Sequence, residues 1–134
     1  MPGENEWLEK SEHDLFGARK LMREPDPIHD LAAFLAQQSA ELALKGFLEA
    51  NEHPFPKIHD IAGLLQMAIE HDTEFRKFYS ISDRITRYAV STRYPEGGGF
   101  YPTSEEVIEA LDFAATVLEL VKSRIADFPG SLPN

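Results

Sequence analysis

Apolar residues recur with helical periodicity in five segments of the chain. In the last of them Val107, Leu111, Ala114, Leu118 and Val121 follow one another at steps of three and four residues. No segment shows the two-residue alternation that is typical of a strand. The predicted helices cover about residues 6–22, 28–50, 59–71, 74–91 with an interruption near 80, and 103–127. The pattern therefore indicates an all-α protein.

The second segment carries the strongest helical signal. Its larger apolar residues form a stripe, and the alanines between them raise helix propensity and permit close packing. The stripe consists of Leu31, Phe34, Leu35 and Leu42, and the alanines are Ala32, Ala33, Ala36, Ala40 and Ala43. We expect the helix to pack through this stripe.

Prolines and a capping motif mark the connections between the helices. Pro25 and Pro27 end the first helix, because a proline cannot continue one. The sequence NEHPFPK separates the second helix from the third, and Thr103 and Glu106 form a capping box for the last. Short connections between amphipathic helices favour an up-and-down bundle of four to five helices.

Length and composition indicate a single folded domain. The chain has 134 residues, enough for one sizeable core and too few for two, so we expect one domain over residues 1–134 with its core at about 6–126. The absence of cysteine excludes a disulfide framework and a thiol nucleophile. No apolar run approaches the roughly 18 residues of a membrane span, and the N-terminus lacks the apolar segment of a signal peptide. We therefore expect a cytoplasmic protein with no membrane contact.

A row of polar residues borders the apolar stripe of the second helix. Gln38, Glu41 and Lys45 lie within about 60° of one another on the helix surface. Buried without partners, such groups would cost several kcal/mol, so they must pair with each other, with another helix or with a ligand. The row is therefore either an internally paired edge of the bundle or a binding site.

One segment carries a net charge opposite in sign to that of the whole chain. The chain carries a formal net charge of −10, which argues against broad binding of nucleic acid. Residues 75–95, the basic segment, instead contain the basic side chains Arg76, Lys77, Arg84, Arg87 and Arg93 against one acid, together with Tyr88 and Tyr94. Arginine matches phosphate geometry and a tyrosine ring can stack on a base, so the segment is a candidate ligand site. The alternative is that its arginines form structural ion pairs and that Tyr88 belongs to the core.

Four of the five histidines precede an aspartate, at His13, His29, His59 and His71. A metal-dependent phosphohydrolase needs further ligands from several helices, and no H-x-x-x-H or H-E-x-x-H spacing occurs, so we expect neither a metal site nor a cofactor. At the start of the third helix Asp60 is expected to act as a cap, while His59 faces either the core or the second helix.

Three motifs occur in order along the chain: QQSAELALKGFL at 37–48, KIHDIAGLL at 57–65 and TRYP at 92–95, followed by a last helix with spaced alanines. Together they resemble the HEPN domains (higher eukaryotes and prokaryotes nucleotide-binding). The resemblance implies a helical bundle that is usually a homodimer and binds nucleotides or short RNA. It also implies a separate minimal nucleotidyltransferase as partner, in some cases as a toxin–antitoxin couple.

The resemblance and the basic segment together give the candidate nucleotide-binding residues. In this set the arginines and Lys45 would contact phosphate. The residues are Gln38, Glu41, Lys45, His59, Arg87, Arg93 and Tyr94.

One branch of the HEPN family cleaves RNA with an arginine that is followed, after four to six residues, by a histidine near a late helix. Here only Arg23 and His29 have that spacing, and they fall in the proline-containing connection between the first two helices. No catalytic residue is therefore evident to move the proton of a ribose 2′-hydroxyl. We expect a non-catalytic nucleotide-binding module, with an RNA-cleaving toxin and a ligand-free dimeric interaction module as the alternatives.

Overall fold

The computed structural model describes residues 3–90 and 101–125. These residues form five α-helices and one 3₁₀-helix and contain no strand, which confirms the all-α prediction. The elements are α1 (Glu4–Arg23), α2 (His29–Ala50), α3 (Ile61–Ile69), the 3₁₀-helix η1 (Thr73–Phe78), α4 (Tyr79–Val90) and α5 (Ser104–Arg124). Within the described ranges no helix is both long enough and apolar enough to cross a membrane.

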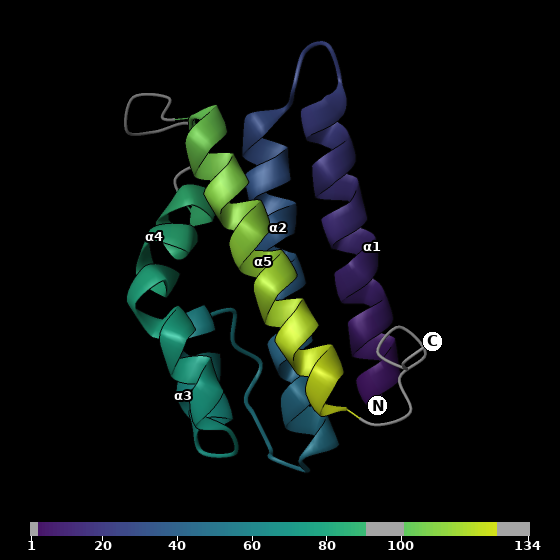
Figure 1. The fold of residues 1–134 in the computed structure, drawn as a ribbon, viewed down its shortest axis with the longest axis vertical. Coiled ribbons are helices and arrows are strands. Elements are labelled where there is room, and N and C mark those ends of the chain that lie inside the picture. The colour runs from purple at the N-terminus through teal and green to yellow at the C-terminus, as the bar shows by residue number, and fades with distance from the viewer. Residues whose placement is uncertain (1–2, 91–100, 126–134) are drawn as a thin grey trace.

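The long helices α1, α2 and α5 run side by side, and the shorter α3, η1 and α4 form a second row beside them (Figure 1). Helix α2 is the central element, because it contacts α1, α3, α4 and α5. The chain rises along α1, returns along α2, and passes through the short row before α5 closes the bundle (Figure 1).

The boundaries of two predicted helices need correction. The third helix was predicted over residues 59–71 but covers Ile61–Ile69, because the Asp60 side chain caps it by accepting the Ala62 N–H at 3.1 Å. The interruption predicted near residue 80 lies at the junction of η1 and α4, where the 3₁₀-helix ends at Phe78. The capping box of α5 is confirmed.

Helices α1 and α2 approach closely through small residues. The Ser11 hydroxyl donates to the Ser39 carbonyl at 2.7 Å, and the Ser39 hydroxyl donates to the Ser11 carbonyl at 2.8 Å. About two turns further along α2, a Cβ on Gly46 would lie 3.1 Å from side-chain atoms of both Leu8 and Trp7 on α1. These contacts fix the register of α1 against α2, and with it the place of the α2 polar row.

The buried face of α2 is its alanine face, so the predicted stripe was wrong in part. All five alanines named above are at most 1% exposed, whereas Leu31 is 44% exposed and Phe34, Leu35 and Leu42 are only half-buried. The reason is geometric: α2 lies against α1 and α5 at once, and small side chains allow both helices to come close. The larger residues are left at the edge of the contact.

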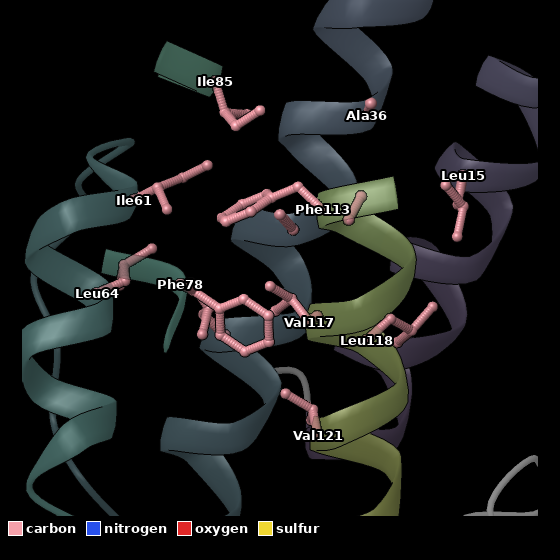
Figure 2. Close-up of a cluster of buried hydrophobic side chains, with 14 of the residues drawn as sticks. Leu15, Ala36, Ile61, Leu64, Phe78, Ile85, Phe113, Val117, Leu118 and Val121 are labelled. Carbon is pink, nitrogen blue, oxygen red and sulfur yellow. The ribbon is translucent and has the colours of Figure 1, made fainter. Parts of the chain in front are cut away.

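The main core lies between α2, α5 and the short row (Figure 2). Ile61 and Leu64 of α3 point toward Phe78 and Phe113, whose ring centroids are 5.8 Å apart in an edge-to-face arrangement. This packing holds the segment before α3 beside the middle of α2, where the polar row lies.

Candidate functional site

The polar row of α2 is assembled as the sequence predicts, and its charged members are almost fully buried. Glu41 is 5% and Lys45 is 7% exposed, and Gln38 lies one turn earlier, half-buried. Withdrawing a carboxylate and an ammonium from water costs several kcal/mol for each ion unless both are paired. The partners of these groups therefore decide what the row can do.

One oxygen of the Glu41 carboxylate holds both of its partners. Oε2 accepts from Lys45 Nζ at 3.1 Å and contacts His59 Nδ1 at 2.9 Å. Because a carboxylate only accepts, His59 Nδ1 carries the proton in this contact. Lys45 Nζ also lies 5.8 Å from the centre of the Trp7 ring, a cation–π contact. No described residue donates to Glu41 Oε1, so half of this buried carboxylate keeps its accepting capacity.

The segment before α3 positions His59. Asp60 caps α3, and Ile61 is completely buried beneath it, so the chain is anchored directly after the histidine. The side chain of His59 turns toward α2 rather than the core and is 74% exposed. Of the two orientations that the sequence left open for His59, the structure shows the one that faces the second helix.

Gln38 is held by a buried acid on α1. Its Nε2 donates to Oδ2 of Asp14 at 2.8 Å, while Lys10 Nζ donates to Oδ1 at 3.0 Å. Asp14 is only 3% exposed, and it was not among the residues predicted for this site. A signal was available, because Asp14 lies three residues after Ser11 and four before Ala18, both of which are on the buried face of α1.

Gln37 is a second residue that the sequence did not single out. Among the described residues, its Oε1 and the Nε1 of Trp7 are buried side-chain atoms without a hydrogen-bond partner. Gln37 is 3% exposed, and its Oε1 accepts no hydrogen bond from any described residue. Leaving a buried acceptor unpaired costs about 1–3 kcal/mol. Such a group calls for an explanation, and a ligand that supplies the missing donor is one.

Two neighbouring pockets share His59. The first, which we name the α2 pocket, has a volume of about 470 Å³ and is lined by Phe34, Gln37, Gln38, Glu41 and His59. The second, the Trp7 pocket, has a volume of about 540 Å³ and is lined by Trp7, Lys45, Glu49, Pro54, Phe55, Pro56, Lys57 and His59. Most residues that line the α2 pocket have polar side chains, whereas the Trp7 pocket is mainly apolar and carries two lysines and Glu49.

The basic segment, the second predicted site, forms ion pairs in which both oxygens of the acid have partners. In the basic segment Arg84 donates to both carboxylate oxygens of Glu109 on α5, from Nε at 3.3 Å and from Nη2 at 2.9 Å. The Tyr88 hydroxyl donates to Oε1 of the same carboxylate at 2.7 Å, and Tyr88 is only 9% exposed. The alternative interpretation, structural ion pairing with Tyr88 in the core, is therefore confirmed for these two residues.

The contacts among Arg84, Tyr88 and Glu109 shift the pKa of each of these side chains. Hydrogen bonds from Arg84, and then from Tyr88, hold the pKa of Glu109 below its usual value. The Glu109 carboxylate in turn raises the pKa of Arg84. Burial raises the pKa of the Tyr88 hydroxyl, and the hydrogen bond to Glu109 adds to the effect. All three shifts stabilise the ion-paired form that the structure shows.

The remaining candidate residues are not brought to the α2 pocket by the described structure. Arg87 is exposed on α4 and lines neither of the two pockets. Arg93 and Tyr94 lie outside the described residues. The role of all three in ligand binding stays a prediction.

Metal-binding side chains and an arginine–histidine pair are the two remaining features that would bear on catalysis. In the described part of the chain, no three His, Asp or Glu side chains come together in a group that could hold a metal ion. Arg23 ends α1 and His29 begins α2, and His29 Nε2 lies 2.8 Å from the Ser104 hydroxyl at the start of α5. The two residues with ribonuclease spacing therefore flank a turn away from the α2 pocket.

These features define a class of protein: a helical bundle with a buried, charged site on its central helix. The family model of the HEPN domain matches residues 4–124. The chain belongs to the HEPN domain family.

A solved structure supports this assignment at the level of the fold and the sequence. The crystal structure of ST0689, an archaeal HEPN homologue, has a TM-score of 0.74 to this chain and is 27% identical to it. The match covers 92% of this chain and 98% of the archaeal one. No curated protein matches the chain. The family and the bundle fold expected from the three motifs are thus confirmed, while the dimer and the ligand stay predictions.

Proposed function

We propose that this HEPN domain is a nucleotide-binding module that holds the base of its ligand in the α2 pocket. The observation that carries the proposal is the accepting capacity left over at a buried carboxylate and a buried amide in one pocket. A group of charges that served only the fold would need partners for every buried atom. Here Glu41 and Gln37 each keep an oxygen for a donor from outside the described chain.

The phosphates of the ligand would lie at the exposed border of the site. His59 is open to solvent there, and Lys57 lines the neighbouring pocket that shares His59. A lysine ammonium and a histidine ring N–H both donate to phosphate oxygens. Arg87, Arg93 and Tyr94 enter the proposal through the basic segment and the TRYP motif of the family.

We further propose that the module is non-catalytic, homodimeric and cytoplasmic, and that it acts with a separate minimal nucleotidyltransferase. Support comes from the family to which the chain belongs and from the place of its only pair with ribonuclease spacing. Arg23 and His29 flank a turn, and His29 is engaged by Ser104.

RNA cleavage is a second candidate function, because one observation favours it. Glu41 accepts from His59 Nδ1 and so orients the ring, which leaves Nε2 as a potential base. The same carboxylate oxygen, however, also neutralises Lys45. We therefore place this activity second, and a cleavage assay with single-stranded RNA and a His59→Ala variant tests it: cleavage that depends on His59 would favour the enzyme.

Calorimetric titration with a panel of nucleoside phosphates tests the proposed function. We expect micromolar binding to the native protein and about tenfold weaker binding to His59→Ala, the effect of one lost hydrogen bond to a charged group. His71→Ala is the matched control, because His71 is exposed and lines neither of the two pockets.

The control variant should bind as the native protein does. If no nucleotide binds the native protein, the proposal fails and the ligand-free interaction module is favoured. Equal loss of binding in both histidine variants would also contradict it, since the effect would then not belong to the α2 pocket.

A further inference from the structure

We infer that the α2 pocket selects guanine among the nucleobases, by presenting acceptors to the adjacent ring N–H and exocyclic amino group of that base. This inference rests on the proposed function and concerns the same site. It depends on the direction of three side-chain groups that line the pocket, from Gln37, Gln38 and Glu41.

The orientation of the Gln38 amide follows from its partner. A carboxylate can only accept, so the group of Gln38 that lies 2.8 Å from Asp14 must be the amide NH₂. The amide oxygen is then on the opposite side of the group, and no described residue donates to it. Asp14 is itself fixed by Lys10, so this orientation is held from α1.

The other two acceptors are unused for different reasons. Oε2 of Glu41 takes both Lys45 and His59, which leaves Oε1 without a described donor. Gln37 is almost completely buried, and its Oε1 has no partner in the described chain. Three residues within about one turn of α2 therefore line one pocket and each carry an accepting oxygen without a described donor.

A ligand that fits this set must offer neighbouring N–H donors on a flat body. Guanine carries a ring N–H beside an amino group, whereas adenine and cytosine place a ring acceptor beside theirs, and uracil and hypoxanthine have no amino group. Phe34 adds an aromatic wall to the pocket. A guanidinium group has the same donor edge, so the experiment must separate a guanine base from an arginine side chain.

Titration of the native protein with GMP and with IMP tests the inference, because IMP lacks only the 2-amino group. We expect GMP to bind at least about tenfold tighter, the effect of one hydrogen bond to an ionised or buried acceptor. The GMP affinity should also be at least about tenfold greater than that of N-acetylarginine amide.

Gln37→Leu removes an acceptor at nearly constant volume. We expect this variant to lose most of the preference for GMP over IMP, and its melting temperature to rise, because an unpaired buried amide has been replaced by an apolar group. Gln66→Leu is the matched control: Gln66 lies on α3, is exposed and donates to Tyr79, so the preference should be unchanged.

The outcomes separate the two proposals. Equal affinity for GMP and IMP would overturn the guanine assignment and leave the nucleotide-binding function standing. Equal affinity for the arginine amide, or an unchanged preference in Gln37→Leu, would also overturn it. Absence of binding for every nucleotide would overturn the proposed function itself, and the guanine assignment with it.

Discussion

The Glu41 carboxylate on α2 and the Glu109 carboxylate on α5 each hold two partners, but they use their oxygens differently. At Glu109 both oxygens are engaged, one by Arg84 and the other by Arg84 and Tyr88. At Glu41 both partners share Oε2. The first carboxylate is saturated by its own fold, and the second is not.

Burial sharpens this contrast. The side chain of Glu109 is 32% exposed, so water can complete any hydrogen bond that the protein leaves open. The side chain of Glu41 is only 7% exposed, so the protein rather than water supplies most of its surroundings. A charged cluster is therefore a better candidate for a binding site when it is buried and has an acceptor without a partner. A high local number of charges alone is a weaker indication.

The largest expected effect comes from breaking the buried ion pair on α2. Lys45→Met leaves Glu41 without its ammonium partner, and we expect a loss of about 3 kcal/mol in the free energy of unfolding. Urea denaturation measures it. The double variant with Glu41→Gln as well should recover most of that loss, because no uncompensated charge then remains in the interior.

The same experiment on the α5 cluster is the comparison. Arg84→Met removes the cation from Glu109 in a more exposed setting, so its effect should be clearly smaller than that of Lys45→Met. Equal effects for the two single variants would show that burial does not distinguish the clusters.

A smaller effect is expected in the pH dependence of stability. The pKa of Glu109 is lowered in the folded state, so the unfolded chain binds its proton more readily. The stability that this carboxylate contributes is therefore complete above its usual pKa, near 4.5, and is lost as the pH falls through the folded value. Glu109→Gln should weaken the fall in melting temperature below about pH 4.5.

Some acid sensitivity should persist in that variant. The hydrogen bond from the Arg124 guanidinium also lowers the pKa of Asp72, so protonation of Asp72 still destabilises the folded protein in acid. Glu105→Gln, at an exposed position of α5, is the matched control and should leave the profile unchanged. An identical profile for Glu109→Gln and the native protein would contradict the assigned ion pair.

Much of the fold could be predicted, because each helix carries its own periodicity and end signals. The Thr103 capping box and the Asp60 cap are local, so the residues that form them are adjacent in sequence. The buried face of α2 was harder to predict. Hydrophobicity favours Leu31 over an alanine, but contact with two helices at once favours the smaller side chain.

The site could be predicted where its residues share one helix. Helical spacing alone places Gln38, Glu41 and Lys45 on one face of α2, so this part of the site does not depend on how the helices pack. Asp14 comes from α1, and its pairing with Gln38 depends on the register of the two helices. Sequence alone does not reveal that register. The partners of the basic segment likewise depend on how α4 meets α5.

The contrast between the two clusters is tested most directly by nuclear magnetic resonance. Side-chain amide and arginine Nε–H signals of the ¹⁵N-labelled protein would be followed while GMP is added. We expect the amide signals of Gln37 and Gln38 to shift and to saturate as GMP is added, while those of Gln66 and the Arg84 Nε–H stay in place. Shifts confined to Arg84 would contradict the account, because the ligand would then bind at the saturated cluster rather than in the α2 pocket.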